Sequence, residues 1–210
     1  MNTTEQQHIA DWLGSGSINI FGRPFAGKDS QGQRLAAIFG GNLLGGGEIM
    51  RGSDMPDRIK SEMRAGKLIP SVDYVAIVLP YLSRPEFANA PMILSSVGRW
   101  HGEENGVLDA LQASNHPLKA VVYLRLEESD VMDRWRDHEN RKDRSERHDD
   151  SELILETRFK EFRDKTLPVI EFYRNKGLLI EIDGTQSRDD VTAEIIKQLH
   201  KFASRALASQ

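Results

Sequence analysis

The segment INIFGRPFAGKDSQG, residues 18–32, decides the fold. A short apolar run enters a glycine-rich turn, and the turn reaches a lysine. The apolar and β-branched residues before the first glycine predict a buried strand over 17–21, and the spacing of apolar residues behind Ser30 predicts a helix over 30–39. The sequence therefore predicts a strand, a glycine-rich turn and a helix in direct succession.

The turn has the spacing of a phosphate-binding loop. Four residues separate Gly22 from Gly27, and Lys28 follows directly. In such a loop, backbone N–H groups surround a phosphate, the dipole of the following helix adds positive charge, and the lysine reaches the outer phosphates. The alternative is a strand-to-helix turn whose glycines serve only tight packing. The position between a predicted strand and a predicted helix favours phosphate binding.

The rest of the chain alternates between strand and helix patterns. Apolar runs predict further buried strands at 90–96, 118–126 and 178–184, and helical spacing predicts helices at 55–70, 72–82, 166–177 and 188–207. This alternation indicates a parallel α/β sheet with right-handed crossovers. We expect a single domain over 1–210, with its core at 17–44, 76–136 and 150–210.

Composition excludes several kinds of chemistry. The 210 residues include no cysteine, so disulfides, thiolate zinc sites and cysteine nucleophiles are absent. The net charge of −4 argues against a nucleic-acid partner. No apolar stretch approaches the ~18 residues of a membrane-spanning helix, and the first residues lack the pattern of a secretory signal. We therefore expect a cytoplasmic monomer with no membrane or nucleic-acid partner.

Residues 22–31, Gly-x-Pro-x-x-Gly-Lys-x-Ser-Gln, resemble the adenylate kinase family of nucleoside monophosphate kinases. Further stretches follow in the family's order: GEIMR (47–51), MRAGKLIPSVDYV (63–75), ILSSVGRW (93–100), RHDD (147–150), TLPVIEFY (166–173) and IDGTQSRDDV (182–191). The resemblance covers about residues 17–200. It implies a P-loop NTPase fold with a five-stranded parallel sheet flanked by helices, a helical flap over the monophosphate at about 45–75, and a short lid at about 137–149.

The resemblance also implies the reaction, which is reversible transfer of the γ-phosphoryl group of ATP, bound with Mg²⁺, to a nucleoside monophosphate. Such transfer needs positioning and neutralisation of charge. The implied catalytic residues are Lys28, Arg99, Arg147 and Arg158. The implied ATP-binding residues are Gly22, Arg23, Pro24, Phe25, Ala26, Gly27, Lys28, Asp29, Ser30, Gln31 and Arg134, which would stack on adenine. The implied monophosphate-binding residues are Glu48, Arg51, Arg99, Glu103, Arg147 and Arg158.

The predicted lid contains almost no apolar residue, which independently indicates a surface element able to move. By resemblance, Asp149 and Asp150 would pair with the arginines and hold the lid closed. They can also cap the helix that begins near Ser151, where acidic residues favour the helix dipole. The two roles are compatible.

Four positions depart from the family pattern. Ser95 stands where the family has the aspartate that orders Mg²⁺ through water, and Glu103 replaces the glutamine that reads the acceptor adenine. Gly45 and Gly46 replace a Ser/Thr pair that contacts the acceptor. These departures suggest an acceptor base other than adenine, or poor reading of adenine.

Asp29 also departs from the pattern. The residue after the lysine is Ser or Thr in the general motif, where its hydroxyl binds Mg²⁺, and it is glycine in the family. Asp29 thus adds a carboxylate at the metal-ligand position of the general motif, while the usual carboxylate at position 95 is missing. One hypothesis is that Asp29 holds the metal. The other is that Asp29 only favours the helix N-terminus, at some electrostatic cost near phosphate.

The retained arginines favour an active nucleoside monophosphate kinase. Two alternatives remain open: a catalytically weakened, nucleotide-binding regulatory homologue, suggested by Ser95, and a P-loop kinase with a different acceptor, such as a small metabolite.

Overall fold

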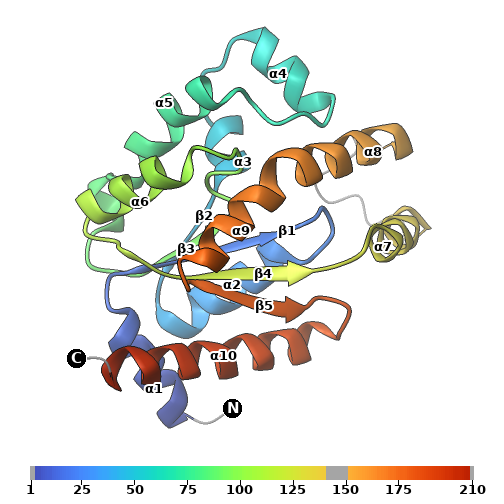
Figure 1. Ribbon diagram of the computed structural model, residues 1–210. Coiled ribbons are helices and arrows are strands. Elements are labelled where there is room, and N and C mark those ends of the chain that lie inside the picture. Colours follow the sequence, from blue (N-terminus) through green and yellow to red (C-terminus); the bar gives the residue numbers. More distant parts are fainter. Residues whose placement is uncertain (1–2, 141–150, 209–210) are drawn as a thin grey trace.

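The computed structural model describes residues 3–140 and 151–208, and these contain one five-stranded sheet (Figure 1). Every neighbouring pair of strands is parallel, in the order β2-β3-β1-β4-β5. The strands are β1 (Ser17–Gly22), β2 (Asn42–Gly45), β3 (Met92–Ser95), β4 (Leu118–Arg125) and β5 (Leu179–Asp183). The predicted five-stranded parallel sheet is confirmed.

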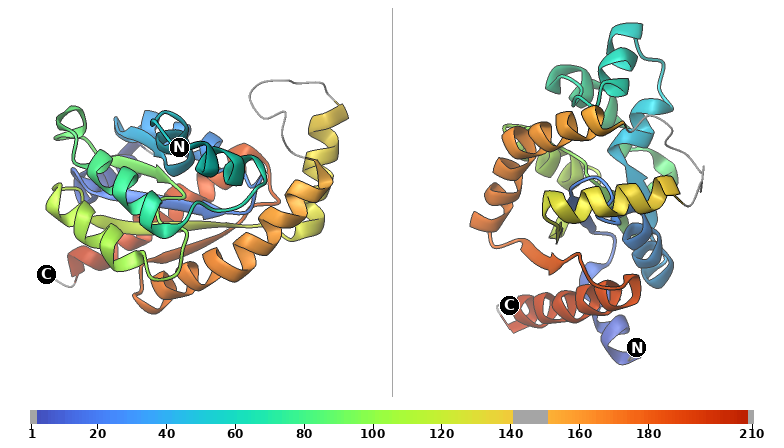
Figure 2. Two further views of the ribbon diagram at one scale, coloured as in Figure 1. Left: turned by 90° about the horizontal axis from the view of Figure 1, so that it is seen from above. Right: turned by 90° about the vertical axis from the view of Figure 1, so that its right-hand side faces the viewer.

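Helices cover both faces of the sheet (Figure 2). They are α1 (Thr3–Leu13), α2 (Lys28–Phe39), α3 (Gly46–Arg51), α4 (Asp57–Arg64), α5 (Ser71–Leu82), the 3₁₀ turn η1 (Pro85–Phe87), α6 (Glu104–Ala113), α7 (Glu128–Asn140), α8 (Glu152–Glu161), the π-helical turn η2 (Phe162–Thr166), α9 (Leu167–Asn175) and α10 (Arg188–Ala208). The first helix, α1, packs beside the last, α10 (Figure 1).

Alternation along β1 and β4 divides the core, because successive strand residues point to opposite faces. On one face, Ile20 and Val122 join a buried cluster with residues of α1, α2 and α10. On the other, Phe21 and Val121 pack against α9. All six residues of β1 are buried, which fits its apolar Ile18, Ile20 and Phe21.

The segment predicted as a flap forms α3, α4 and the start of α5, which rise beyond the end of the sheet (Figure 1). Its buried Met50 and Ile59 join one cluster with Val78 of α5 and with buried residues of β2, β3 and α6. The predicted lid begins in the last turn of α7, and most of it lies outside the described residues. Flap and lid motion remain predictions.

The sequence predicts one helix that begins near Ser151 and another at 166–177. The structure joins them, because α8, η2 and α9 follow one another without a break in the ribbon (Figure 2). The π-helical turn between them carries Thr166, whose hydroxyl donates to the backbone carbonyl of Arg99 at 3.3 Å. Through Thr166, this continuous helical segment therefore contacts the residues that follow β3.

Candidate functional site

The carboxyl ends of the parallel strands meet at one edge of the sheet and carry the predicted site segments. The glycine-rich loop follows β1, α3 follows β2, and residues 96–99 follow β3. β1 and β3 are neighbours, with Ile20 opposite Ser95. In open α/β sheets, ligands bind outside the carboxyl ends of the strands, where successive connections turn to opposite sides.

The loop has the geometry of a phosphate-binding nest. A Cβ on Gly22 would lie 2.9 Å from the Cβ of Ala26, so no larger residue fits there. Gly27 has a φ of 88°, a left-handed conformation that glycine adopts without strain. The ammonium of Lys28, the first residue of α2, donates to the Arg23 carbonyl at 2.8 Å. Lysine and helix N-terminus thus converge on the loop, as anion binding requires.

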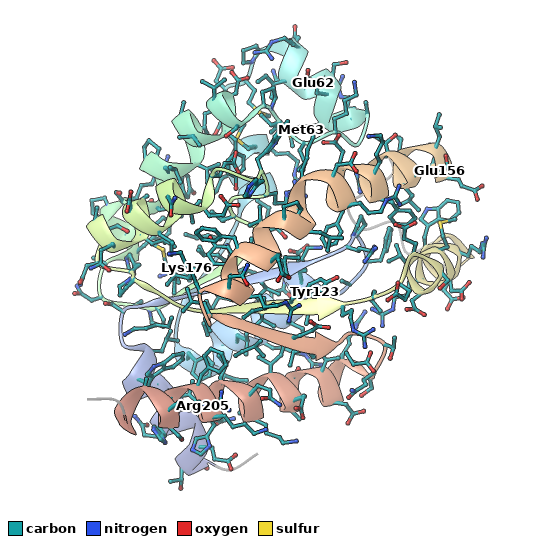
Figure 3. The ribbon with its side chains drawn as sticks, in the orientation of Figure 1. Glu62, Met63, Tyr123, Glu156, Lys176 and Arg205 are labelled. Carbon is teal, nitrogen blue, oxygen red and sulfur yellow. The ribbon has the colours of Figure 1, made fainter. Side chains whose placement is uncertain are left out.

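The side chain of Arg23 anchors this loop instead of pointing toward a ligand. Its Nη1 donates to the Leu126 carbonyl at 2.9 Å, and its Nη2 lies 3.5 Å from the Glu128 carboxylate. Its guanidinium also lies 5.1 Å from the ring centroid of Phe162. In turn, Phe162 stacks with Tyr123 of β4, which Figure 3 labels, at a centroid distance of 6.3 Å. Only the backbone of Arg23 remains a candidate for phosphate binding.

The side chain of Gln31, one of the predicted ATP-binding residues, contacts α10. A role of Gln31 in ATP binding stays a prediction. Gln31 is buried, its amide donates to the Arg188 carbonyl at 2.9 Å, and its Oε1 accepts from the Thr192 hydroxyl at 2.8 Å. Its backbone N–H donates to the carbonyl of Gly27. Gln31 therefore holds α2 against α10, and the pattern match alone could not show which way its side chain points.

Arg134 of α7 lies beside the loop. Its guanidinium donates to the carbonyl of Phe25 at 3.1 Å and to that of Gly184. It thereby connects the loop to the turn after β5. Stacking of Arg134 on an adenine remains a prediction.

Asp29 and Ser95 meet where α2 begins and β3 ends. The Ser95 hydroxyl donates to Oδ1 of Asp29 at 2.7 Å, and Ser95 is buried. The described residues contain no cluster of three or more His, Cys, Asp or Glu that could hold a metal. Mg²⁺ typically binds one or two carboxylates together with substrate phosphates, so a single carboxylate beside the loop fits this ion.

The acceptor side of the predicted site lies between the flap and the segment after β3. Tyr74 of α5 is buried, and its hydroxyl accepts from the Gly98 N–H at 3.2 Å. Glu103 is also buried, and its Oε2 accepts from the Trp100 N–H at 3.0 Å. Burial raises the pKa of Tyr74 to about 12 and raises the pKa of Glu103 above its ordinary value.

Buried Asn19 positions this segment. Its side-chain amide donates to the Val97 carbonyl at 2.7 Å, and its Oδ1 accepts from the Val97 N–H at 3.2 Å. The side-chain nitrogen and oxygen of buried Asn19 therefore both have hydrogen-bond partners in the loop that carries Arg99. The sequence shows only a polar residue within an apolar strand, which could have signalled this contact.

The irregular flap segment 65–70, between α4 and α5, is bound at two points. The Leu68 N–H donates to the Glu161 carboxylate at 3.0 Å, and the indole of Trp100 donates to the Ile69 carbonyl at 2.8 Å. The Lys165 ammonium lies 3.9 Å from the Trp100 ring centroid. Sequence reasoning missed these residues because their contacts are distant along the chain.

The predicted phosphate arginines are distributed over the elements around this edge. Arg51 is exposed at the end of α3, and Arg99 follows β3. Arg158 lies on α8 beside Gly66, where an added Cβ would be 3.2 Å from the Arg158 Cγ. Glu48 folds back toward Gly45 at the start of α3, where an added Cβ would lie 3.1 Å from its Oε2. Arg147, Asp149 and Asp150 lie outside the described residues.

Comparisons with known proteins agree with this geometry. Residues 20–178 match the family described as adenylate kinase. An adenylate kinase of Nitrobacter winogradskyi is 31% identical over 193 residues, covering 87% of this chain and 92% of that protein. An adenylate kinase of Archaeoglobus fulgidus is 26% identical, covering 90% and 100%. The crystal structure of a gluconokinase from Sinorhizobium meliloti superposes with a TM-score of 0.66 at 20% identity, covering 93% and 98%, and shows the shared fold.

Among the described residues, no helix combines the length and the apolar character needed to cross a membrane.

Proposed function

Because the chain belongs to the adenylate kinase family and has its P-loop α/β fold, we propose that it transfers the γ-phosphoryl group of ATP reversibly to a nucleoside monophosphate. Family membership makes the chain a nucleotide-binding phosphotransferase. The observation that carries the finer proposal is the loop itself, in which Gly27 is left-handed and Lys28 folds over the turn beside the end of β3.

The chemistry assigned to the site is mainly electrostatic. In phosphoryl transfer, negative charge spreads over the oxygens of the transferred group, and fixed cations stabilise it. Lys28 would contact the outer phosphates of ATP, while Arg51 and Arg99 would hold the acceptor phosphate. Arg158 would bridge the two nucleotides. Guanidinium groups suit this role because they grip phosphate oxygens at two points and stay charged at any working pH.

Mg²⁺ would supply further neutralisation of the ATP phosphates when bound. This chain's own contribution is the loop, the arginines and the exclusion of water. The flap, held at Leu68 and Ile69, would cover the acceptor and limit transfer to water.

For the acceptor base, we propose that adenine is not preferred. The pairing edge of adenine offers one donor and one acceptor, which a glutamine amide matches with its own acceptor and donor. An ionised Glu103 carboxylate only accepts hydrogen bonds, so it leaves the adenine acceptor unmatched. Guanine presents two adjacent donors on this edge and suits an ionised carboxylate better.

The test is to incubate the purified protein with ATP and Mg²⁺ and to add AMP, GMP, CMP or UMP separately. Formation of ADP together with the matching nucleoside diphosphate supports the proposal. ATP binding without any ADP would indicate a catalytically weakened homologue. ATP consumption that needs a non-nucleotide acceptor would indicate a different kinase. A wide preference for AMP would contradict the proposed base selection.

A further inference from the structure

We infer that Asp29 supplies the carboxylate that holds Mg²⁺ at the ATP phosphates, and that the Ser95 hydroxyl orients this carboxylate. The inference rests on the proposed function, since it concerns the same nucleotide site. It assigns the metal to the first turn of α2 instead of the end of β3.

The position of Asp29 is the first argument. Asp29 directly follows Lys28, where phosphate-binding loops place the side chain that reaches Mg²⁺. That side chain is normally a neutral hydroxyl, and here it is a carboxylate, an oxygen ligand that Mg²⁺ prefers. Asp29 therefore lies at the metal position of the loop with suitable chemistry.

The contact with Ser95 is the second argument. At 2.7 Å, Oδ1 of Asp29 and Oγ of Ser95 share one small space between the loop and the end of β3. Two carboxylates at this separation would repel each other strongly, and at least one pKa would rise. This space accommodates one ionised carboxylate. With Asp29 in place, a neutral donor at position 95 is the compatible partner.

Charge balance gives the third argument. Without a cation, the Asp29 carboxylate would face the negative phosphates of ATP and weaken their binding. With Mg²⁺ between them, the carboxylate and the phosphates are both attracted to the cation, so the same carboxylate favours binding. If Asp29 only favoured the helix dipole, its removal would strengthen ATP binding with Mg²⁺ as well as without it, whereas removal of a metal ligand weakens binding with Mg²⁺. The two roles therefore differ in how Mg²⁺ changes the affinity for ATP.

The experiment measures that change by calorimetric titration of the full chain with ATP, without an acceptor, in EDTA and in excess Mg²⁺. The ratio of the two dissociation constants is the Mg²⁺ enhancement. In the Asp29→Asn variant, we expect the enhancement to fall by about 10- to 100-fold, the usual cost of losing a metal-site partner. Metal-free ATP should bind more tightly than to the wild type, because a repelling charge is gone.

A pair of substitutions then moves the carboxylate to the strand. Asp29→Gly alone should behave like Asp29→Asn, and it serves as a second variant should the amide disturb folding. Asp29→Gly combined with Ser95→Asp should recover most of the Mg²⁺ enhancement. As a matched control, Asp57→Asn removes an exposed aspartate from the first turn of α4 and should leave the enhancement unchanged.

The outcomes separate this inference from the proposed function. A wild-type Mg²⁺ enhancement in both Asp29→Asn and Asp29→Gly would overturn the metal assignment while leaving ATP binding intact. Absence of ATP binding by the wild-type chain in both conditions would overturn the nucleotide site as a whole. Loss in the single variants with recovery in the double variant supports the inference.

Discussion

The hydroxyl of Tyr74 occupies the space that any side chain at position 46 would need, because a Cβ on Gly46 would lie closer than 3.0 Å to it. Tyr74 is buried, and its hydroxyl is fixed by the N–H of Gly98. With Tyr74 in this place, only glycine fits at position 46 without a rearrangement. The absence of a side chain at position 46 therefore reflects how α5 packs beside the segment after β3.

This packing predicts that Gly46→Thr destabilises the protein by about 1–3 kcal/mol, the usual cost of overpacking. Adding Tyr74→Phe should recover part of this loss, since it removes the hydroxyl that the threonine meets. Urea unfolding monitored by fluorescence gives the free energies. Gly47→Ala is the control, because a Cβ there meets only the flexible end of Arg51 at 3.4 Å. Equal stability of Gly46→Thr and the wild type would refute the packing account.

A second prediction concerns Glu103 and pH. Its raised pKa means that the folded protein binds the Glu103 proton more tightly than the unfolded chain, whose carboxyl titrates near 4.5. Ionisation of Glu103 therefore costs folding free energy as the pH rises above about 4.5. Relative to the wild type, Glu103→Gln should gain stability between pH 4.5 and 8, and the difference should shrink at lower pH. Parallel stability curves over this range would contradict the assignment.

The same substitution tests base selection. Glu103→Gln restores a group with one donor and one acceptor, so we expect the ratio of kcat/KM for AMP over that for GMP to rise by about 10-fold, equivalent to one matched hydrogen bond. Steady-state kinetics with saturating ATP gives this ratio. Glu104→Gln is a poor control because Glu104 is itself buried, whereas Glu171→Gln removes the same charge from an exposed residue of α9 outside the predicted site. An unchanged ratio would remove Glu103 from base recognition.

A fourth prediction concerns the hydrogen bond that binds the flap segment 65–70 to Trp100. Trp100→Phe keeps an aromatic ring beside Lys165 but removes the indole N–H that binds the Ile69 carbonyl. The lost hydrogen bond should cost about 1 kcal/mol and loosen residues 66–70. Amide hydrogen exchange should become faster at residues 66–70 and stay unchanged in β1. Unaltered exchange at 66–70 would show that the indole bond does not restrain the flap.

The sheet and the phosphate-binding turn were accessible from sequence because both depend on local pattern. Burial of β1 on both faces favours apolar residues such as Ile18, Ile20 and Phe21. The left-handed backbone at Gly27 favours glycine. The spacing from Gly22 to Lys28 then follows from the reach of a loop around a phosphate.

Contacts between distant segments were not accessible. Nothing near Arg23 shows that its guanidinium turns toward Leu126, and nothing near Gln31 shows that its amide binds α10. The π-helical turn that joins α8 to α9 contains no glycine or proline that would mark it in the sequence. The hydrogen bond between Ser95 and Asp29 links two positions that sequence reasoning could pair only as a hypothesis.

The central claim is most directly tested by ³¹P nuclear magnetic resonance of ATP, Mg²⁺ and a nucleoside monophosphate with the wild-type chain and with Lys28→Ala. Lys28 is half-buried at the start of α2, so its truncation should leave the fold intact while removing a cation from the transferred phosphate. We predict ADP and the matching diphosphate with the wild type, and a rate at least about 100-fold lower with Lys28→Ala. Full turnover by folded Lys28→Ala, or no diphosphate from any monophosphate with the wild type, would contradict the account.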